Sequence, residues 1–334
     1  MYKSILASAL ITLSASSAFA LDFSALNQAI ANSQQYNPWT IITDQIKFDL
    51  KYVSQLEKHR RNGATQYNAE TYAAFDAADS IGYDGSGVHV LINDDFRPSA
   101  THGRDVKFIT SVFANGANLV QGVNANSHRE NDTFHVINES FGSTPITSGA
   151  NALDLLNGST WAGQGRQPQS LTNSDNLDQL RNLSTRRVAQ NWGNHNSLFV
   201  TGAANDGADC STIIKCNHVL SKHVAFGETF IAVGALNDHG TDLDGYSNRA
   251  GIFQDYYISA PVAQIGNKRG TSFAAPIVTA AAAVITETFG TNAVQTRDII
   301  LNTADDLGAP GTDAIFGRGR LNVHRALSPI GALR

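Results

Sequence analysis

Four short apolar runs, rich in β-branched residues and each ending in a polar or glycine-rich segment, constrain the fold of this chain more than any other feature. They lie at residues 87–94, 134–142, 197–207 and 230–238. Two segments typical of helices separate or follow them, at residues 176–192 and 272–290. Buried strands that alternate with helices indicate a largely parallel sheet with helices on both faces. In such a sheet, functional residues gather at the carboxyl ends of the strands.

The helical segment 272–290 begins with a hydroxyl residue and is apolar almost all the way round. Such a helix should run through the interior, and its first turn carries unpaired backbone N–H groups at the positive end of the helix dipole. One interpretation is that Thr271 or Ser272 simply caps the helix. The sequence Gly-Thr-Ser-x-Ala-x-Pro is more constrained than a cap requires, because Gly270 allows close backbone approach and Pro276 removes a donor.

This motif resembles that of the subtilisin-like serine peptidases, the subtilase family, in which its serine is the nucleophile. The resemblance implies an α/β fold, a subtilisin-like three-layer sandwich with a largely parallel sheet and helices on both faces. It also implies that Ser272 has an aspartate and a histidine as partners, in the chain order Asp, His, Ser.

The aspartate of the family stands at the end of a Val-x-Val-rich strand. In this chain the apolar run 88–92 is followed by Asn93, and Asp94 takes the family position. Asp95 is the alternative, and an Asp-Asp turn that merely ends the strand is a further interpretation of the same residues.

The histidine of the family usually opens a His-Gly-Thr-His-Val motif at the start of a buried helix. Here His102 and Gly103 are followed by Arg104, Asp105 and Val106, so only His-Gly and the valine are kept. Eight positions separate Asp94 from His102, fewer than in most relatives, yet enough to pass from a strand end into a helix. The other candidate histidines match the motif less well: His89, His135, His195 and His223.

Two further segments resemble substrate-binding parts of the family. The run 136–142, Val-Ile-Asn-Glu-Ser-Phe-Gly, implies that an extended peptide pairs with Ser140, Phe141 and Gly142 by strand addition. An ordinary buried strand and turn is the alternative for these seven residues.

The run 199–207, Phe-Val-Thr-Gly-Ala-Ala-Asn-Asp-Gly, resembles the family strand whose asparagine donates to the developing oxyanion. Asn205 takes that position, although Asn-Asp-Gly is also a good turn signal. Ala203 and Ala204 would line the substrate pocket, and Ala204 stands where relatives usually have glycine, so its methyl group would narrow the primary specificity pocket.

Later segments resemble the family in the expected order, so that the resemblance covers roughly residues 75–328. They are residues 230–238, 246–251, 257–262 and 316–327. The implied function is a secreted serine endopeptidase with an acyl-enzyme intermediate, in a catalytic domain at residues 67–334. Two alternatives remain. One is a secreted pseudopeptidase that binds peptides without cleaving them. The other is the related acid-acting serine peptidases, which have an aspartate at the position of Asn205.

The N-terminal residues 1–20 have a lysine, a short apolar core and then Ala-Phe-Ala, which predicts a signal peptide and a secreted or periplasmic protein. A transmembrane helix is the alternative, although it would need a longer apolar stretch. Residues 21–66 are polar and typical of helices, and form either an N-terminal helical extension or a short propeptide.

The chain has only two cysteines, Cys210 and Cys216. In an oxidising compartment, two such neighbours most often form a disulfide. A zinc or redox pair is the less favoured alternative, because the spacing is not Cys-x-x-Cys.

The formal net charge of −5, without an extended Lys/Arg stripe, argues against a nucleic-acid partner. The partner expected is a protein or peptide substrate, with no stable membrane association, and the oligomeric state is left open. No cofactor is required, but relatives often bind calcium in Asp/Asn-rich loops. Residues 237–245 have the composition for such a loop or for a polar turn.

Overall fold

The computed structural model describes residues 66–96, 100–122, 133–140, 196–211, 216, 219, 223, 226–263, 265 and 268–328. All of them belong to one compact unit, Ala64–Arg334. The predicted signal peptide, residues 21–65 of the predicted extension and the predicted helix at 176–192 lie outside the described residues.

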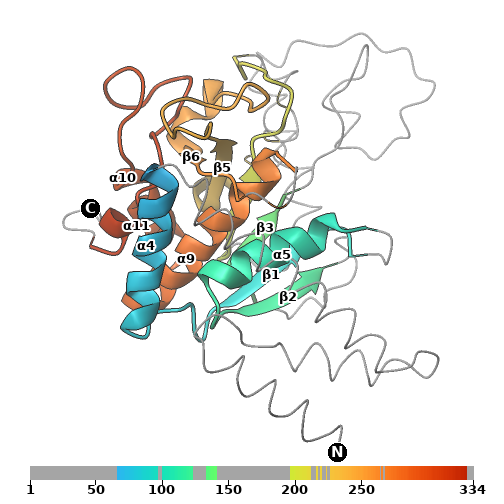
Figure 1. Ribbon diagram of the computed structural model, residues 1–334, viewed down its shortest axis with the longest axis vertical. Coiled ribbons are helices and arrows are strands. Elements are labelled where there is room, and N and C mark those ends of the chain that lie inside the picture. The colour runs from blue at the N-terminus through green and yellow to red at the C-terminus, as the bar shows by residue number, and fades with distance from the viewer. Residues whose placement is uncertain are drawn as a thin grey trace, which may run out of the picture. The chain divides into compact units, whose positions relative to one another are not determined.

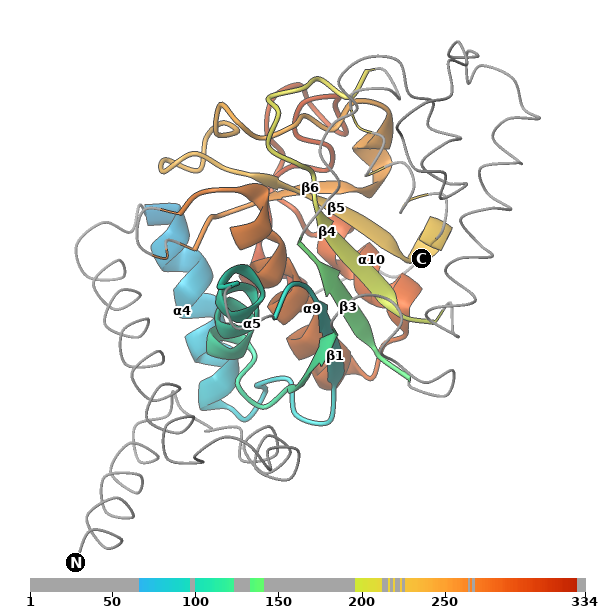
Figure 2. The same cartoon turned by 90° about the vertical axis from the view of Figure 1, so that its right-hand side faces the viewer.

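A six-stranded parallel sheet forms the centre of the protein, with the strand order β2-β1-β3-β4-β5-β6 (Figures 1 and 2). The strands are β1 (His89–Asn93), β2 (Asn118–Gly122), β3 (Val136–Glu139), β4 (Leu198–Gly202), β5 (Phe230–Ala235) and β6 (Tyr257–Ala260). The chain passes from β1 to β2 on one side and returns to β3 on the other. The sheet therefore has a topological switch point between β1 and β3, where α/β proteins commonly bind ligands.

Helices pack against this sheet and against one another (Figures 1 and 2). The helices are α4 (Gln66–Ser80), α5 (His102–Phe113), α9 (Ala275–Phe289), α10 (Ala293–Asn302) and α11 (Val323–Ala326), and the 3₁₀ turns are η1 (Gly227–Thr229), η2 (Gly251–Tyr256) and η3 (Thr271–Phe273). In Figure 2, α5 and α9 lie side by side against the sheet, in agreement with their direct contacts.

The strand register shows that both faces of the sheet are covered. Leu91, Ile137, Phe199 and Phe230 are register partners in successive strands, so they form one row on one face. This row belongs to a buried apolar cluster that also contains both cysteines. The next residue of β3, Asn138, points to the other face and bonds to α9. The predicted parallel α/β architecture is therefore confirmed.

The helix α9 crosses the interior, as its composition predicts. The segment Thr271–Phe289 is long and apolar enough to span a membrane by those criteria alone, but 83% of its apolar window is buried within the protein. The helix ends at Phe289 and is capped by Gly290, which has a left-handed backbone with φ of 63°. This segment is therefore a core helix, and its first turn brings Ser272 to the edge of the sheet.

Candidate active site

Three adjacent strands deliver the candidate residues to one edge of the sheet. Asp94 directly follows β1, Ser140 directly follows β3, and Asn205 lies three residues beyond the end of β4. Because β1, β3 and β4 are parallel neighbours, their carboxyl ends lie at the same edge. This edge is the place at which the sequence predicted a site.

Asp94 and His102 form a close pair. The Nδ1 atom of His102 lies 2.9 Å from each carboxylate oxygen of Asp94. Asp94 is only 3% exposed, whereas the His102 side chain is 37% exposed. Because a carboxylate only accepts hydrogen bonds, Nδ1 is the donor in this pair, and in the neutral imidazole Nε2 then presents a lone pair. The pair is therefore arranged as a buried acceptor behind a partly accessible base.

Gly103 allows this pair to form at so short a spacing. A Cβ atom at Gly103 would lie 2.8 Å from the backbone oxygen of Asp95 and 3.0 Å from the Cβ atom of Asp94. Any other residue would push α5 away from the end of β1. The His-Gly dipeptide thus brings the first turn of α5 directly against the aspartate.

Ser272 lies in the η3 turn that precedes α9, and it is 8% exposed. Its hydroxyl donates to the backbone oxygen of Ser140 at 2.6 Å. The ring of the next residue, Phe273, lies 5.6 Å from the His102 ring, centroid to centroid. Ser272 therefore lies beside both the end of β3 and the start of α5, and its hydroxyl does not cap the helix.

Glycines let the η3 turn approach the strands. Gly270 has φ of 150°, a backbone conformation that other residues rarely adopt. A Cβ atom at Gly202 would lie 2.7 Å from the Thr271 hydroxyl oxygen. The end of β4 and the serine turn are consequently in direct backbone contact.

Asn205 is held by this same turn. Its side-chain oxygen accepts a hydrogen bond from the backbone N–H of Thr271 at 2.8 Å. With the oxygen so engaged, the amide nitrogen of Asn205 is the side chain's hydrogen-bond donor. The asparagine is thereby fixed in an orientation that suits an oxyanion donor.

A buried hydrogen-bond chain, not predicted from the sequence, supports Ser140. The Ser140 hydroxyl donates to Asn138 at 2.8 Å, and the Asn138 amide donates to Thr279 at 2.8 Å. Thr279 in turn donates to the backbone of Ala275 in α9. A buried asparagine inside the apolar strand run was the one sequence signal for this chain of bonds.

Asn248 holds the loop that follows Asn205 and was also not predicted. Its side-chain oxygen accepts from the backbone N–H groups of Asp206 and Ala208, at 3.1 Å and 2.9 Å. Its amide donates to the sulfur of Cys216, which is joined by a disulfide bond to Cys210. The disulfide thus lies in the apolar cluster next to the loop that follows Asn205.

Of the remaining predicted site residues, the structure describes Ala203 and Ala204, and others lie outside the described residues. Phe141, Gly142 and the alternative base His195 are among the latter. Ala203 is buried at the end of β4, and Ala204 has an unusual φ of 80°. Among the described residues, His102 is the histidine that contacts Asp94.

The alternative histidines that the structure describes lie away from Asp94. His89 opens β1 and its ring lies 5.7 Å from that of His135, at the opposite edge of the sheet from Asp94. Burial and the neighbouring His89 lower the pKa of His135. His223 packs among the aromatic rings of Phe230, Phe253 and Tyr256.

In the candidate calcium loop at residues 237–245, side-chain oxygens that could bind a metal are bonded to other groups of the protein. Arg269 bonds to the carboxylates of both Asp238 and Asp244 at 2.9 Å. The side-chain oxygen of Asn237 accepts backbone N–H groups of its own loop. Over the described residues no cluster of three or more His, Cys, Asp or Glu side chains is available for a metal. In this structure Arg269 therefore takes the place that a cation would have between Asp238 and Asp244.

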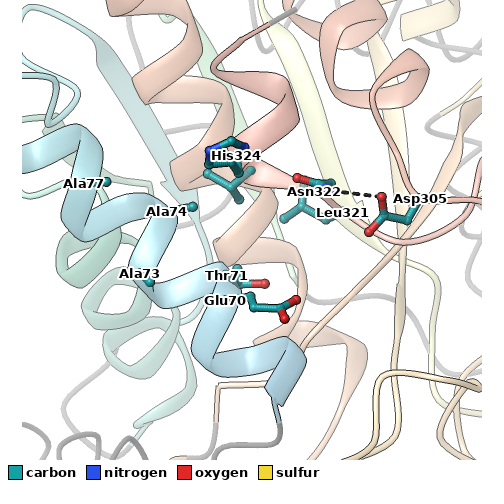
Figure 3. Close-up of a pocket in the computed structure, with 10 residues that line it drawn as sticks. Glu70, Thr71, Ala73, Ala74, Ala77, Asp305, Leu321, Asn322 and His324 are labelled. Atoms are coloured by element: carbon teal, nitrogen blue, oxygen red, sulfur yellow. Dashed lines mark hydrogen bonds between the residues drawn. The ribbon is translucent and has the colours of Figure 1, made fainter.

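A pocket of about 380 Å³ lies elsewhere, between α4 and the segment around α11 (Figure 3). Glu70 and Thr71 line it from α4, and Asn322 and His324 line it from the other side, with Asn322 bonded to Asp305. It contains none of the candidate site residues, so it is separate from the site at the sheet edge.

The described part of the chain is thus an α/β protein with a serine, a histidine and an aspartate gathered at the carboxyl edge of a parallel sheet. The model of the subtilase family, Peptidase S8, matches residues 90–319. The match spans more than half of the chain, and the chain belongs to the subtilase family.

Three curated relatives match parts of the chain. An extracellular serine protease of Serratia marcescens is 48% identical over 137 residues, 40% of this chain and 13% of the relative. Serotype-specific antigen 1 of Mannheimia haemolytica is 30% identical over 152 residues, 40% of this chain and 16% of the relative. The autotransporter lipoprotein NalP of Neisseria meningitidis is 28% identical over 219 residues, 58% of this chain and 20% of the relative. The matched regions thus cover a fifth or less of the length of these relatives.

The fold is also similar to that of a solved lanthipeptide protease. The two share 18% sequence identity with a TM-score of 0.50, and the match covers 78% of this chain and 95% of the other. At this identity the likeness concerns the fold alone.

Proposed function

We propose that this protein is a secreted serine endopeptidase that cleaves proteins or peptides through Ser272, His102 and Asp94. The observation that carries the proposal is the pair of buried Asp94 and partly exposed His102 beside the η3 turn that presents Ser272. The family match and the named serine protease among the relatives support the same chemistry.

The reaction follows from the roles that the geometry allows. Ser272 Oγ attacks the peptide carbonyl carbon while Nε2 of His102 takes its proton, and Asp94 stabilises the resulting imidazolium through Nδ1–H. The C–N bond then breaks, and His102 passes the proton to the leaving amine. Water, activated by His102, cleaves the acyl-enzyme and restores the Ser272 hydroxyl.

The oxyanion of each tetrahedral intermediate would lie between Asn205 and the serine turn. The Asn205 amide nitrogen and the backbone N–H of Ser272 are the donors, and the bond from Thr271 to Asn205 fixes the amide in advance. A donor fixed before the reaction stabilises the developing charge without reorganising during the step.

Substrate binding would free the nucleophile. In the structure the Ser140 carbonyl accepts a hydrogen bond from the Ser272 hydroxyl. An extended peptide that adds as a strand along Ser140, Phe141 and Gly142 would use the same carbonyl as an acceptor. A substrate N–H that takes this acceptor leaves the hydroxyl free to turn to His102. Ala203 and Ala204 would line the adjoining pocket, whose width the Ala204 methyl limits.

The test is cleavage of quenched-fluorescence peptides by purified protein, beside two variants. Ser272→Ala should reduce hydrolysis to background with an unchanged thermal melt, because the hydroxyl is the nucleophile. Asn205→Ala should lower kcat by about 10²- to 10³-fold, the loss measured at this position in subtilisin, a member of the same family. Unchanged hydrolysis in Ser272→Ala would contradict the proposal.

The second candidate function is a pseudopeptidase that binds peptides without cleaving them. The departure from the family motif after His102–Gly103, and the Ser272 hydroxyl held by Ser140, favour it. It predicts that a peptide binds to the wild type with normal affinity while no cleavage product forms. Cleavage that depends on Ser272 excludes it.

We further propose that the protein is secreted or periplasmic. The signal-peptide pattern of residues 1–20 and the Cys210–Cys216 disulfide support this location, because disulfides persist in oxidising compartments. The N-terminal sequence of the mature protein tests it. A sequence that begins at Leu21 or later supports export, and retention of Met1 contradicts it.

A further inference from the structure

A buried carboxylate that the proposed mechanism does not use lies one turn after His102. Asp105 is fully buried, with 0% exposure, in the first turn of α5. It occupies the fourth position of the segment that begins at His102, where the family motif described above has a second histidine. A buried charge costs free energy unless it is paired, so the role of Asp105 depends on the group that pairs with it.

That partner is Lys268, which comes from the other half of the site. Its ammonium bonds to Oδ2 of Asp105 and donates to the Thr101 hydroxyl at 2.8 Å. Thr101 precedes α5, and its side chain caps no backbone N–H. Lys268 therefore binds the start of the helix at two points.

Lys268 also stands four residues before Ser272, in the segment that enters the η3 turn. A single ammonium group thus joins the first turn of α5, which carries His102, to the segment that carries Ser272. The two elements are 163 residues apart along the chain at this contact.

The ion pair between Lys268 and Asp105 has a buried carboxylate and a partly exposed ammonium. The other oxygen of Asp105, Oδ1, is buried and has no hydrogen-bond partner among the described residues. Among the described residues, the side-chain hydrogen bond to this carboxylate therefore comes from Lys268. The Lys268 side chain itself is 41% exposed, so a change there need not open a cavity in the core.

We propose that Lys268 and Asp105 are positioning residues that hold the base His102 at its working distance from the nucleophile Ser272. The inference rests on the proposed peptidase function. A displacement of about 1 Å between a base and a nucleophile can lower a rate by about 10²-fold. Neither Lys268 nor Asp105 touches the reacting atoms in this assignment.

The test compares kcat and KM for a short peptide across three variants. Lys268→Met keeps the aliphatic stem and should lower kcat by about 10- to 100-fold, with KM changed by less than about threefold. Lys268→Arg keeps the charge and should recover most of kcat. The double variant Lys268→Met with Asp105→Asn removes the ion pair without leaving a buried unpaired charge, and it should fold while keeping the low kcat.

Arg269→Ala is the matched control. Arg269 is the neighbouring cation in the same segment, but its partners Asp238 and Asp244 lie on a different loop and not on α5. Its kcat should stay within about twofold of the wild type. Each rate is taken per folded molecule, with the folded fraction measured by circular dichroism.

Two results would overturn the inference while the proposed function stands. One is a kcat for Lys268→Met no lower than that of Arg269→Ala. The other is full activity in the double variant, which would mean that neutralising a buried charge is all that Lys268 does. A wild type that neither cleaves peptides nor reacts with a serine-directed probe would instead overturn the proposed function, and this inference with it.

Discussion

Ala204 has a backbone conformation that is unfavourable for a residue with a side chain. Its φ of 80° falls in the left-handed region, where among the described non-glycine residues only Cys210 joins it. An alanine there costs about 1 kcal/mol or more relative to glycine. The strained residue directly precedes Asn205, so the conflict lies within the proposed oxyanion loop.

Ala204→Gly is therefore expected to relieve strain and to widen the proposed pocket. The free energy of unfolding should rise by up to about 1 kcal/mol, the strain relief being partly offset by the greater freedom of glycine in the unfolded chain. The ratio of kcat/KM for a peptide with phenylalanine before the cleaved bond to one with alanine there should also rise. Urea unfolding and peptide kinetics measure the two effects.

Ala203→Gly is the matched control for the backbone effect. Ala203 is buried and is not among the residues with positive φ, so glycine there should only destabilise the protein. Equal destabilisation by both glycine variants would contradict the assignment of strain to Ala204.

The strand β3 and the helix α9 are joined by a polar connection inside an otherwise apolar interface. Asn138 is fully buried, and its two side-chain bonds reach Ser140, which directly follows the same strand, and Thr279 on the helix. Because a buried amide must keep its partners, this connection fixes how the two elements meet beside Ser272.

Thr279→Val tests that connection at nearly constant volume. The change leaves the Asn138 amide without its acceptor, so the free energy of unfolding should fall by about 1–3 kcal/mol. Thr288→Val is the control, because Thr288 lies on the same helix, donates to the carbonyl four residues before it as Thr279 does, and is only partly buried. A loss in Thr288→Val as large as in Thr279→Val would show that the bond to Asn138 contributes nothing.

At this scale the sequence predicted the elements with strong apolar character. The strands β1, β3, β4 and β5 and the core helix α9 all lie within the runs that indicated them. The edge strand β2 was not predicted, because its residues are partly exposed and lack a continuous apolar run. The helix α4 was not predicted either, since its alanine-rich sequence has little contrast between its faces.

The candidate site likewise contains residues that the sequence predicted and contacts that it did not. Ser272 and Asp94 stand in local motifs that resemble those of the subtilase family, so the resemblance implied both, and the structure places them at one edge of the sheet. The bond between Asp105 and Lys268 joins residues far apart in the chain, and no local pattern marks either partner. The roles of the site residues in catalysis stay predictions.

The whole molecule brings together residues that lie far apart in the sequence. The parallel sheet collects Asp94, Ser140 and Asn205 at one edge, and the η3 turn that leads into the core helix α9 brings Ser272 to the same edge from the C-terminal part of the chain. The central claim is that this assembly activates one serine.

The most direct measurement is labelling of the purified protein by a fluorophosphonate probe at neutral pH, with the modified residue identified by mass spectrometry. Heat-denatured protein is the control, because its serines have no positioned base. The account predicts a single adduct on Ser272 in the folded wild type, no adduct in Ser272→Ala, and strongly slowed labelling in His102→Ala. An adduct on another serine, undiminished labelling in His102→Ala, or no labelling of the folded wild type would contradict it.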